Sequence, residues 1–474
     1  MADAQPIPPS PARLLSASSH TAPGKLIITE VSFDVPLNHD IPESTRIRLF
    51  GRIVTHREQP IVGDTLPGGG RPWLAYLEGG PGFGNRSPQD SPLVKENLHQ
   101  SYRILFLDYR GTGLSTPVSA TTIPGDSADD KAAYLSHFRQ DSIVKDLEAV
   151  RLCLTKKDPP NLRSWSIWGQ SFGGFVSLTY LSFFPDGLRE VFLTGGLAPV
   201  NVRPEVVYEA TFKKVVERNV AYYEKFPEDA TAVHYIASHI KQQGGKIQLP
   251  GGGYLTVPRF LTLGISFGGH EGIHSVHALL NKMKLEIAQF GHFTRSTLTA
   301  LEQDTTFDTD PIYAILHEAI YCYGPGVASD WAAFRVGSKL EPFYWLSADY
   351  KAPHRGSESA PLEPLYFSGE MIFPFHFDTY PELISLKEVA QKLALHDEWP
   401  RLYDEEQLAR NEVSVFAASY VDDMYVDFDL ARATAKKVRG IRVFETNALY
   451  HNAVRAKSGE VISALMRLRD DPIE

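Results

Sequence analysis

From Arg103 to Val200, short apolar runs alternate with glycine-containing turns and helix-forming segments. The runs RILFL, SWSIW and EVFLT are each followed by a glycine turn, and an amphipathic segment occupies residues 138–154. Strands that are apolar along their whole length and alternate with helices are typical of a parallel sheet buried on both faces. The sequence therefore predicts an α/β fold, with helices on both sides of a mostly parallel sheet.

The flanking segments divide the chain into a core and an insertion. Before residue 77, shorter β-like runs predict antiparallel strands at the start of the sheet. The alternation stops after residue 200, and strand patterns resume at VSVFAASY and GIRVFET. We therefore expect a poorly ordered amino-terminal arm at residues 1–24 and a core domain made of residues 25–200 and 409–474. Residues 201–408 are expected to form a largely helical insertion.

The charge and the cysteine content exclude several classes of partner. The chain has 47 basic and 57 acidic residues and a net charge of −10, which would repel a nucleic-acid backbone. Its two cysteines, Cys153 and Cys322, have no metal-binding spacing and cannot form a disulfide framework. Signal peptides and membrane spans require longer apolar runs than any present here. We expect a cytoplasmic protein that binds neither nucleic acid nor membranes.

The segment Gly169-Gln170-Ser171-Phe172-Gly173 matches the pattern G-x-S-x-G. An apolar strand, WSIW, precedes it and a helix-forming run follows it, which is the setting of a nucleophile elbow. On such a sharp turn the serine hydroxyl is exposed, and the small residues on either side let the strand and the helix pack closely. The five-residue pattern alone is common, but its flanks favour Ser171 as a catalytic nucleophile.

A glycine-rich turn, Glu78-Gly79-Gly80-Pro81-Gly82, follows the earlier strand WLAYL. In hydrolases with a nucleophile elbow, a loop at this place supplies a backbone N–H that stabilises the developing oxyanion. Glycine lets the backbone approach a substrate carbonyl closely. A plain tight turn is the alternative, but the position two strands before the nucleophile favours an oxyanion loop.

The remaining catalytic residues are expected near the carboxyl end of the chain. Proteins with this elbow carry an Asp or Glu after a late strand and a His after the last strand. Asp422 and Asp423 end the run VSVFAASYV, and His451 follows IRVFETN. The order serine, acid, histidine is therefore satisfied, with either aspartate as the acid.

A second motif, His270-Glu271-Gly272-Ile273-His274, matches the zinc-binding pattern H-E-x-x-H. Two histidines one helical turn apart would bind the metal, and the glutamate would act as the base. Glycines before and inside the motif instead predict that a helix begins there, whereas a zinc helix usually holds its ligands in a middle turn. We therefore interpret the motif as the start of a helix in the insertion, and we expect no metal or other cofactor.

Together, the segments EGGPG, DYRGTGLSTP, WGQSFGGF, YVDDMYVDFDLA and YHNAVR resemble the proline iminopeptidases. The resemblance covers nearly the whole chain from Lys25, and it implies an α/β-hydrolase fold with the insertion as a helical cap over the active site. Glu78 departs from the family, in which many members have histidine before the glycines. The positions that match the family's site are Ser171 as nucleophile, His451 as base, Asp423 as acid, Gly80 and Phe172 as oxyanion donors, and Glu318 and Glu370 as cap acids that bind the substrate's amino group.

This resemblance implies a serine exopeptidase that releases an amino-terminal residue, preferentially proline, from peptides through an acyl-enzyme. An esterase, lactonase or amidase acting on a small metabolite would use the same triad, because the cap determines the substrate. A zinc-dependent peptidase using residues 270–274, and a non-catalytic binding protein that has kept the fold, are further alternatives. The expected partner is a short peptide or another small molecule.

Overall fold

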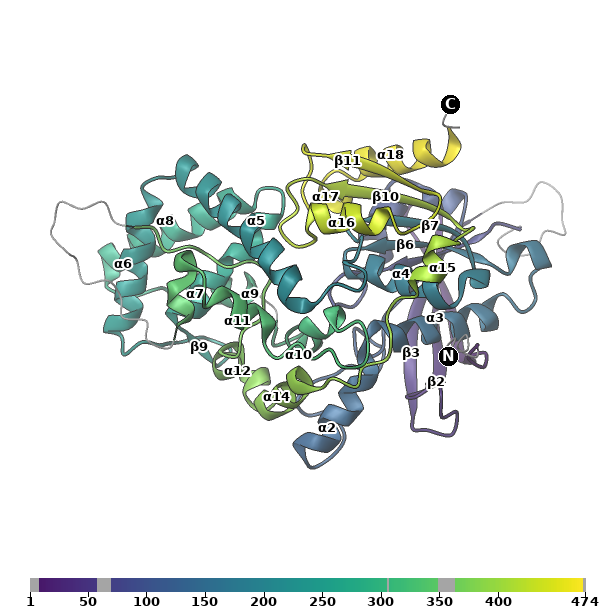
Figure 1. Ribbon diagram of the computed structural model, residues 1–474, viewed down its shortest axis with the longest axis horizontal. Coiled ribbons are helices and arrows are strands. Elements are labelled where there is room, and N and C mark those ends of the chain that lie inside the picture. The colour runs from purple at the N-terminus through teal and green to yellow at the C-terminus, as the bar shows by residue number, and fades with distance from the viewer. Residues whose placement is uncertain (1–7, 58–69, 305–306, 348–362, 472–474) are drawn as a thin grey trace.

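The computed structural model describes residues 8–57, 70–304, 307–347 and 363–471. A nine-stranded sheet forms the centre of one half of the molecule, at the right of Figure 1, in the order β1-β2-β3-β5-β4-β6-β7-β10-β11. The strands span Arg13–Ala22 (β1), Leu26–Pro36 (β2), Arg46–His56 (β3), Trp73–Leu77 (β4), Arg103–Leu107 (β5), Trp165–Gln170 (β6), Leu188–Thr194 (β7), Ser414–Tyr420 (β10) and Ile441–Thr446 (β11). Pairing is antiparallel from β1 to β5 and parallel from β5 to β11. The predicted α/β fold with a mostly parallel sheet is confirmed.

Helices cover both faces of this sheet. Two adjacent residues of β6 are therefore buried in different hydrophobic clusters, Ile167 in one and Trp168 in the other. Successive side chains of a strand point to opposite faces, so a sheet covered on both sides needs apolar residues at every position. The helices that follow or flank the core strands are α1 (Pro92–Lys95), α2 (Ala128–Leu135), α3 (Gln140–Leu154), α4 (Phe172–Phe183), α16 (Phe428–Ala435), α17 (Ala453–Ala456) and α18 (Ser458–Asp470).

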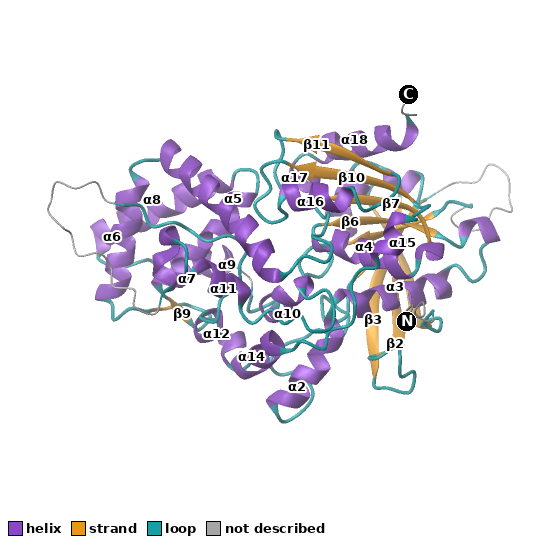
Figure 2. Cartoon of the chain, viewed as in Figure 1, coloured by secondary structure: helices purple, strands orange, loops and turns teal. Residues whose placement is uncertain are grey.

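The chain between β7 and β10 is largely helical and forms the other half of the molecule in Figures 1 and 2. We propose this segment as the cap. One predicted boundary needs a change, because α15 (Glu405–Ala409) crosses residue 408 and packs against α4 of the core. The other elements are α5 (Pro204–Lys225), α6 (Asp229–Gln242), β8 (Ile247–Gln248), β9 (Tyr254–Leu255), α7 (Val257–Leu261), α8 (Gly272–Phe290), α9 (Arg295–Asp304), α10 (Pro311–Leu316), α11 (Ala332–Gly337), α12 (His376–Thr379), α13 (Pro381–Ile384) and α14 (Lys387–Leu395).

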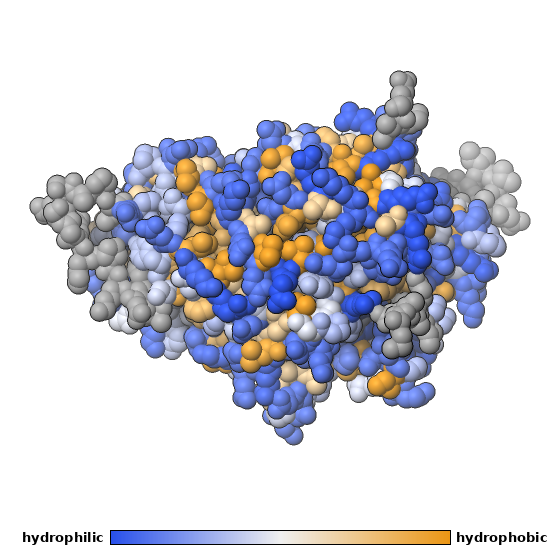
Figure 3. Space-filling view, in the orientation of Figure 1, coloured by the Kyte–Doolittle hydropathy of each residue, from blue (hydrophilic) through white to orange (hydrophobic). Residues whose placement is uncertain are grey.

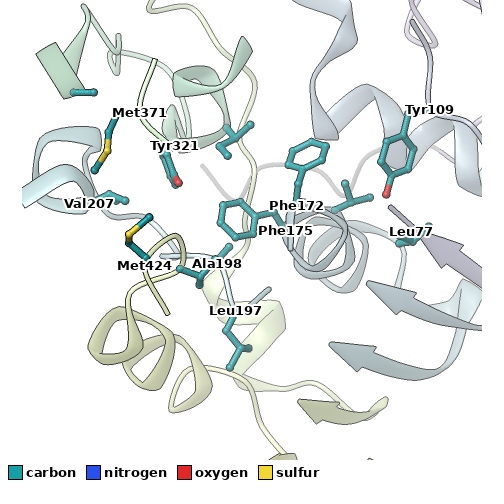
Figure 4. Close-up of a cluster of buried hydrophobic side chains, with 14 of the residues drawn as sticks. Leu77, Tyr109, Phe172, Phe175, Leu197, Ala198, Val207, Tyr321, Met371 and Met424 are labelled. Carbon is teal, nitrogen blue, oxygen red and sulfur yellow. The ribbon is translucent and has the colours of Figure 1, made fainter. Parts of the chain in front are cut away.

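Hydrophobic side chains of the core and of the proposed cap share one cluster. In Figure 4, Phe172 and Phe175 of α4 lie between Tyr109 on one side and Tyr321 and Val207 on the other. The rings of Tyr109 and Phe172 are 6.1 Å apart, and those of Phe175 and Tyr321 are 6.0 Å apart. This apolar contact holds the cap against the helix that begins directly after Ser171.

The amino-terminal segment differs from its prediction. Residues Arg13–Ala22 form β1, an edge strand paired with β2, and do not belong to a poorly ordered arm. Nine of the ten residues of β1 are exposed, so the strand lacks the apolar alternation by which strands are recognised in a sequence. Its order comes from backbone pairing with β2, which side-chain patterns do not record. Residues 1–7 of the predicted arm lie outside the described residues.

The surface in the view of Figure 3 is mainly hydrophilic, and hydrophobic residues gather there in small groups. Within the described ranges, no helix has both the length and the apolar character that a membrane span requires. Both cysteines, Cys153 and Cys322, are unpaired.

Candidate active site

Ser171 lies on the sharp turn between β6 and α4. Its backbone has φ 53° and ψ −121°, a conformation that costs a non-glycine residue on the order of 1–3 kcal/mol. A Cβ atom at Gly169 would lie 2.4 Å from the carbonyl oxygen of Gly173, and one at Gly173 would lie 2.1 Å from the carbonyl oxygen of Leu77. Both distances are too short, so the packing of the turn requires the two glycines of G-x-S-x-G. The turn places Ser171 at the wall of a cavity of about 170 Å³.

Ser171, His451 and Asp423 form a hydrogen-bonded row. Ser171 Oγ lies 2.9 Å from His451 Nε2, and His451 Nδ1 lies 3.0 and 2.8 Å from the two carboxylate oxygens of Asp423. The backbone N–H groups of Tyr425 and Val426 donate to Asp423 Oδ1 at 2.9 and 3.0 Å, which holds the carboxylate in place. Burial alone would lower the pKa of His451, but the Asp423 carboxylate raises it above the ordinary value. The row can therefore take a proton from the serine.

The neighbouring Asp422 points away from this row. Its side chain is 41% exposed and lies 3.5 Å from the ammonium group of Lys214, whereas the side chain of Asp423 is 2% exposed. The geometry therefore favours Asp423 as the acid partner of His451.

The glycine turn after β4 lies directly against Ser171. A Cβ atom at Gly79 would lie 3.2 Å from the Cβ of Ser171, and two of the three glycines of the turn, Gly79 and Gly80, line the cavity of Ser171. Phe172 is the first residue of α4, so its N–H group has no acceptor within the helix. The backbone N–H groups of Gly80 and Phe172 are our candidates for the oxyanion donors.

Two contacts that sequence reasoning missed support the loops of the site. The Glu78 carboxylate accepts the N–H of Gly79 at 2.7 Å and forms an ion pair with Arg455. The Gln170 amide donates to the backbone carbonyl of His451 at 3.2 Å. The glycine turn after β4 and the turn at Ser171 therefore both contact the segment that contains His451. The sequence shows that residues 78 and 455 have opposite charges, but nothing in it indicates that these two residues are in contact.

Of the two predicted cap acids, Glu370 lines the cavity of Ser171. The Tyr313 hydroxyl donates to Glu370 Oε2 at 3.5 Å, and Nε2 of His317 lies 4.0 Å from Glu370 Oε1. Burial raises the pKa of Glu370 to about 8, against the opposing effect of His451. A ligand bound beside Ser171 could therefore contact the poorly solvated carboxyl group of Glu370.

Glu318 is not among the residues that line the cavity of Ser171. Its carboxylate accepts the backbone N–H groups of Ala332 and Ala333, at 3.2 and 2.9 Å, where α11 begins. Burial raises the pKa of Glu318 to about 7, although the hydrogen bond from Ala333 opposes this rise. The structure therefore places Glu370 in the cavity of Ser171 and Glu318 at the beginning of a helix in the proposed cap.

The motif at residues 270–274 does not place its two histidines on one helical turn. Helix α8 begins at Gly272, and Glu271 before it has φ 64°, so the prediction that a helix begins within the motif is confirmed. The His270 N–H donates to Asn452 Oδ1 at 2.9 Å, which links the proposed cap to the residue after His451. In the described part of the chain, the side chains close enough together to hold a metal ion are those of Glu228, Asp229 and His277.

Known proteins resemble this chain over nearly its full length. Residues 72–242 match the family model described as the α/β hydrolase fold. A proline iminopeptidase of Aspergillus aculeatus is 38% identical over 466 residues, which cover 98% of this chain and 98% of the relative. A proline iminopeptidase of Aeromonas sobria is 40% identical over 441 residues, which cover 93% of this chain and 96% of the relative.

Proposed function

The chain belongs to the proline iminopeptidase family, and from this premise we propose how its residues release an amino-terminal proline from short peptides. The protein is a serine hydrolase of the α/β-hydrolase fold and an aminopeptidase. The observation that carries the mechanism is the hydrogen-bonded row of Ser171, His451 and Asp423, which shares its cavity with the partly buried carboxyl group of Glu370.

In this mechanism Ser171 Oγ attacks the carbonyl carbon of the first peptide bond while His451 Nε2 takes the hydroxyl proton. Asp423 holds the imidazole with Nδ1 protonated and stabilises the imidazolium that forms. The backbone N–H groups of Gly80 and Phe172 stabilise the tetrahedral oxyanion. His451 then donates the proton to the leaving amine, and water hydrolyses the acyl-enzyme by the same route in reverse.

Apolar side chains in the cavity support the preference for proline. Phe83 of the oxyanion loop stacks on Tyr313 of the cap with ring centroids 5.2 Å apart, and both line the cavity with Ile265 and Tyr425. A pyrrolidine ring is compact and apolar, so its burial against these side chains is favourable. A charged first side chain would meet the same walls without this gain.

Glu370 is our candidate for binding the protonated amino group of the substrate. An ionised carboxylate in a cavity that excludes water forms charge-assisted hydrogen bonds, which are worth roughly 1.5–3 kcal/mol. Such a bond separates a free amino terminus from the neutral peptide bond of a continuing chain. For Glu318 we propose a structural role instead, because its oxygens already accept two N–H groups of α11.

We expect Glu370→Gln to lower kcat/KM for a proline arylamide by about one to two orders of magnitude, because the amide keeps the shape but loses the charge. Hydrolysis of a small uncharged ester should fall much less. Glu318→Gln is the matched control, and it should lower the melting temperature and affect both substrates alike. An equal loss on both substrates for Glu370→Gln, or a loss confined to amino substrates for Glu318→Gln, would reverse the two assignments.

The pH dependence of kcat/KM should reflect the ionisation of the Glu370 carboxyl group. Because its pKa is about 8, the carboxyl is mostly protonated at pH 6 and becomes ionised as the pH rises. A protonated amine binds the ionised form, so the ratio of kcat/KM of the wild type to that of Glu370→Gln should increase by about tenfold between pH 6 and 8. Taking the ratio removes the titration of the substrate, which is the same for both enzymes. A ratio that stays constant over this range would contradict the assignment.

The proposed activity is tested most directly with three substrates assayed in parallel. A proline arylamide should be hydrolysed, the same compound with a blocked amino group should not, and a simple ester should be a poor substrate. Ester hydrolysis that exceeds arylamide hydrolysis would favour the esterase alternative.

We also propose that the enzyme acts in the cytoplasm on free peptides. Cys153 and Cys322 are both unpaired thiols, as is usual in a reducing compartment. The net charge of −10 disfavours nucleic acid as a partner. Cell fractionation with an activity assay on each fraction would test the location.

A further inference from the structure

A second cavity, of about 250 Å³, adjoins the cavity of the nucleophile. The two cavities share Glu78 and Arg455 as lining residues. All the residues that line the second cavity come from the core, from segments around β4, β5, α1 and α17. Among the described residues, neither Glu370 nor any other residue of the proposed cap lines it. The second cavity therefore extends the active site on a side that the amino-binding carboxyl group does not occupy.

The charges around this second cavity favour an anion. Its lining contains three cations, Arg86, Lys95 and Arg455, and two carboxylates, Glu78 and Asp90. Glu78 is already paired with Arg455. In the described ranges no ion pair involves Arg86 or Lys95, and both are exposed, so their charges are accessible to a ligand. Asp90 also has no ion pair among the described residues, so the unpaired charges are two cations and one carboxylate, with a net positive charge. An anion that enters would also meet the remaining donors of the Arg455 guanidinium, which Glu78 holds in place.

This inference rests on the proposed function, which sets the direction of the substrate. We propose that the second cavity binds the carboxyl-terminal carboxylate of a short peptide whose amino terminus lies at Glu370. The scissile carbonyl lies at Ser171, and the leaving part continues away from the amino group. One extended residue spans about 3.3–3.6 Å, so the free carboxylate of a dipeptide or tripeptide lies within one or two residues of the cleaved bond. Glu78 and Arg455 line both cavities, so the two cavities are adjacent and the leaving part would reach the second one past this ion pair.

The two charged ends of such a substrate then meet opposite charges, a carboxylate from the cap and cations from the core. The enzyme should therefore prefer peptides of two or three residues with a free carboxyl group over amidated peptides of the same sequence. Longer peptides carry their carboxylate beyond the cations and should lose this advantage. Specificity for peptide length would in this way come from Arg86 and Lys95, which lie outside the catalytic row.

The test compares prolylglycine, prolylglycine amide and a proline arylamide as substrates. For the wild type we expect kcat/KM for prolylglycine to exceed that for its amide by about five- to tenfold, mainly through KM. The double variant Arg86→Gln/Lys95→Gln should bring this ratio close to one, and Arg86→Glu/Lys95→Glu should favour the amide. High salt should weaken the wild-type preference, because both cations are exposed. The control variant Lys156→Gln/Lys157→Gln removes the same number of charges at exposed residues that do not line the cavity, and it should leave the ratio as it is.

The arylamide distinguishes a failure of this inference from a failure of the proposed function. If the wild type hydrolyses the arylamide but treats prolylglycine and its amide alike, the carboxylate site is wrong and the aminopeptidase activity stands. The same conclusion follows if the charge-reversed variant keeps the wild-type ratio. If none of the three proline substrates is hydrolysed, the proposed function is wrong, and the carboxylate site is wrong with it.

Discussion

Replacing Ser171 by alanine is expected to lower kcat on a proline arylamide by on the order of 10⁵- to 10⁶-fold, with the fold intact. The variant keeps the Cβ atom that packs against Gly79 and loses only the hydroxyl that donates to His451. Without a nucleophile no acyl-enzyme can form, and the remaining rate comes from the oxyanion donors and substrate binding alone. Steady-state kinetics measure the loss, and thermal unfolding followed by circular dichroism checks the fold.

Two further measurements show whether this loss reflects covalent catalysis. A fluorophosphonate should label the wild type at Ser171 and should leave the alanine variant unlabelled. A chelator should not affect the wild type, since each proton transfer in the mechanism uses a side chain of the row. Near-normal turnover by Ser171→Ala would remove this serine from the mechanism. Loss of activity on chelation that zinc restores would instead favour the motif at residues 270–274.

That Ser171 and His451 lie together could be predicted because each follows an apolar strand. Ser171 comes directly after β6, and His451 comes a few residues after β11. Parallel strands of one sheet place their carboxyl ends at the same edge, so residues 280 positions apart in the sequence meet there. The local apolar pattern was sufficient to predict the positions of these two residues, because any residue that closely follows a parallel strand lies at the same edge of the sheet.

Other parts of the site depend on packing that no local pattern records. Glu318 and Glu370 both lie in segments that resemble the family's cap, but one carboxylate accepts N–H groups at the start of α11 and the other lines the cavity. Which of the two reaches the nucleophile depends on how separate cap segments pack. The ion pair of Glu78 with Arg455 joins residues 377 positions apart, and β1 is ordered by its backbone although its side chains are exposed. Apolar patterns in a sequence indicate which faces of helices and strands are buried. These features are polar contacts between distant residues or backbone pairing, so no apolar pattern indicates them.

The two aspartates after β10 show the same limit, because they are adjacent in the sequence and have different surroundings. Asp423 Oδ1 accepts two backbone N–H groups, so an oxygen is required at that position. In Asp423→Asn the amide oxygen would occupy it, and the NH₂ group would replace Oδ2, which lies 2.8 Å from His451 Nδ1. The NH₂ group can only donate there, so Nδ1 would become the acceptor and Nε2 would carry the proton.

A histidine protonated at Nε2 cannot take the proton of Ser171, so Asp423→Asn should lower kcat by on the order of 10³- to 10⁴-fold. Asp422→Asn is the matched control, since it makes the same chemical change one residue earlier. Its side chain is 41% exposed and faces Lys214 at 3.5 Å, so the variant should lose at most about 1 kcal/mol of stability and keep kcat within a few-fold of the wild type. Both variants would be assayed on the proline arylamide, and thermal unfolding would show that Asp423→Asn is folded. A large loss in Asp422→Asn with a small one in Asp423→Asn would make Asp422 the acid of the triad, and the hydrogen bonds between Asp423 and His451 would then have only a structural role.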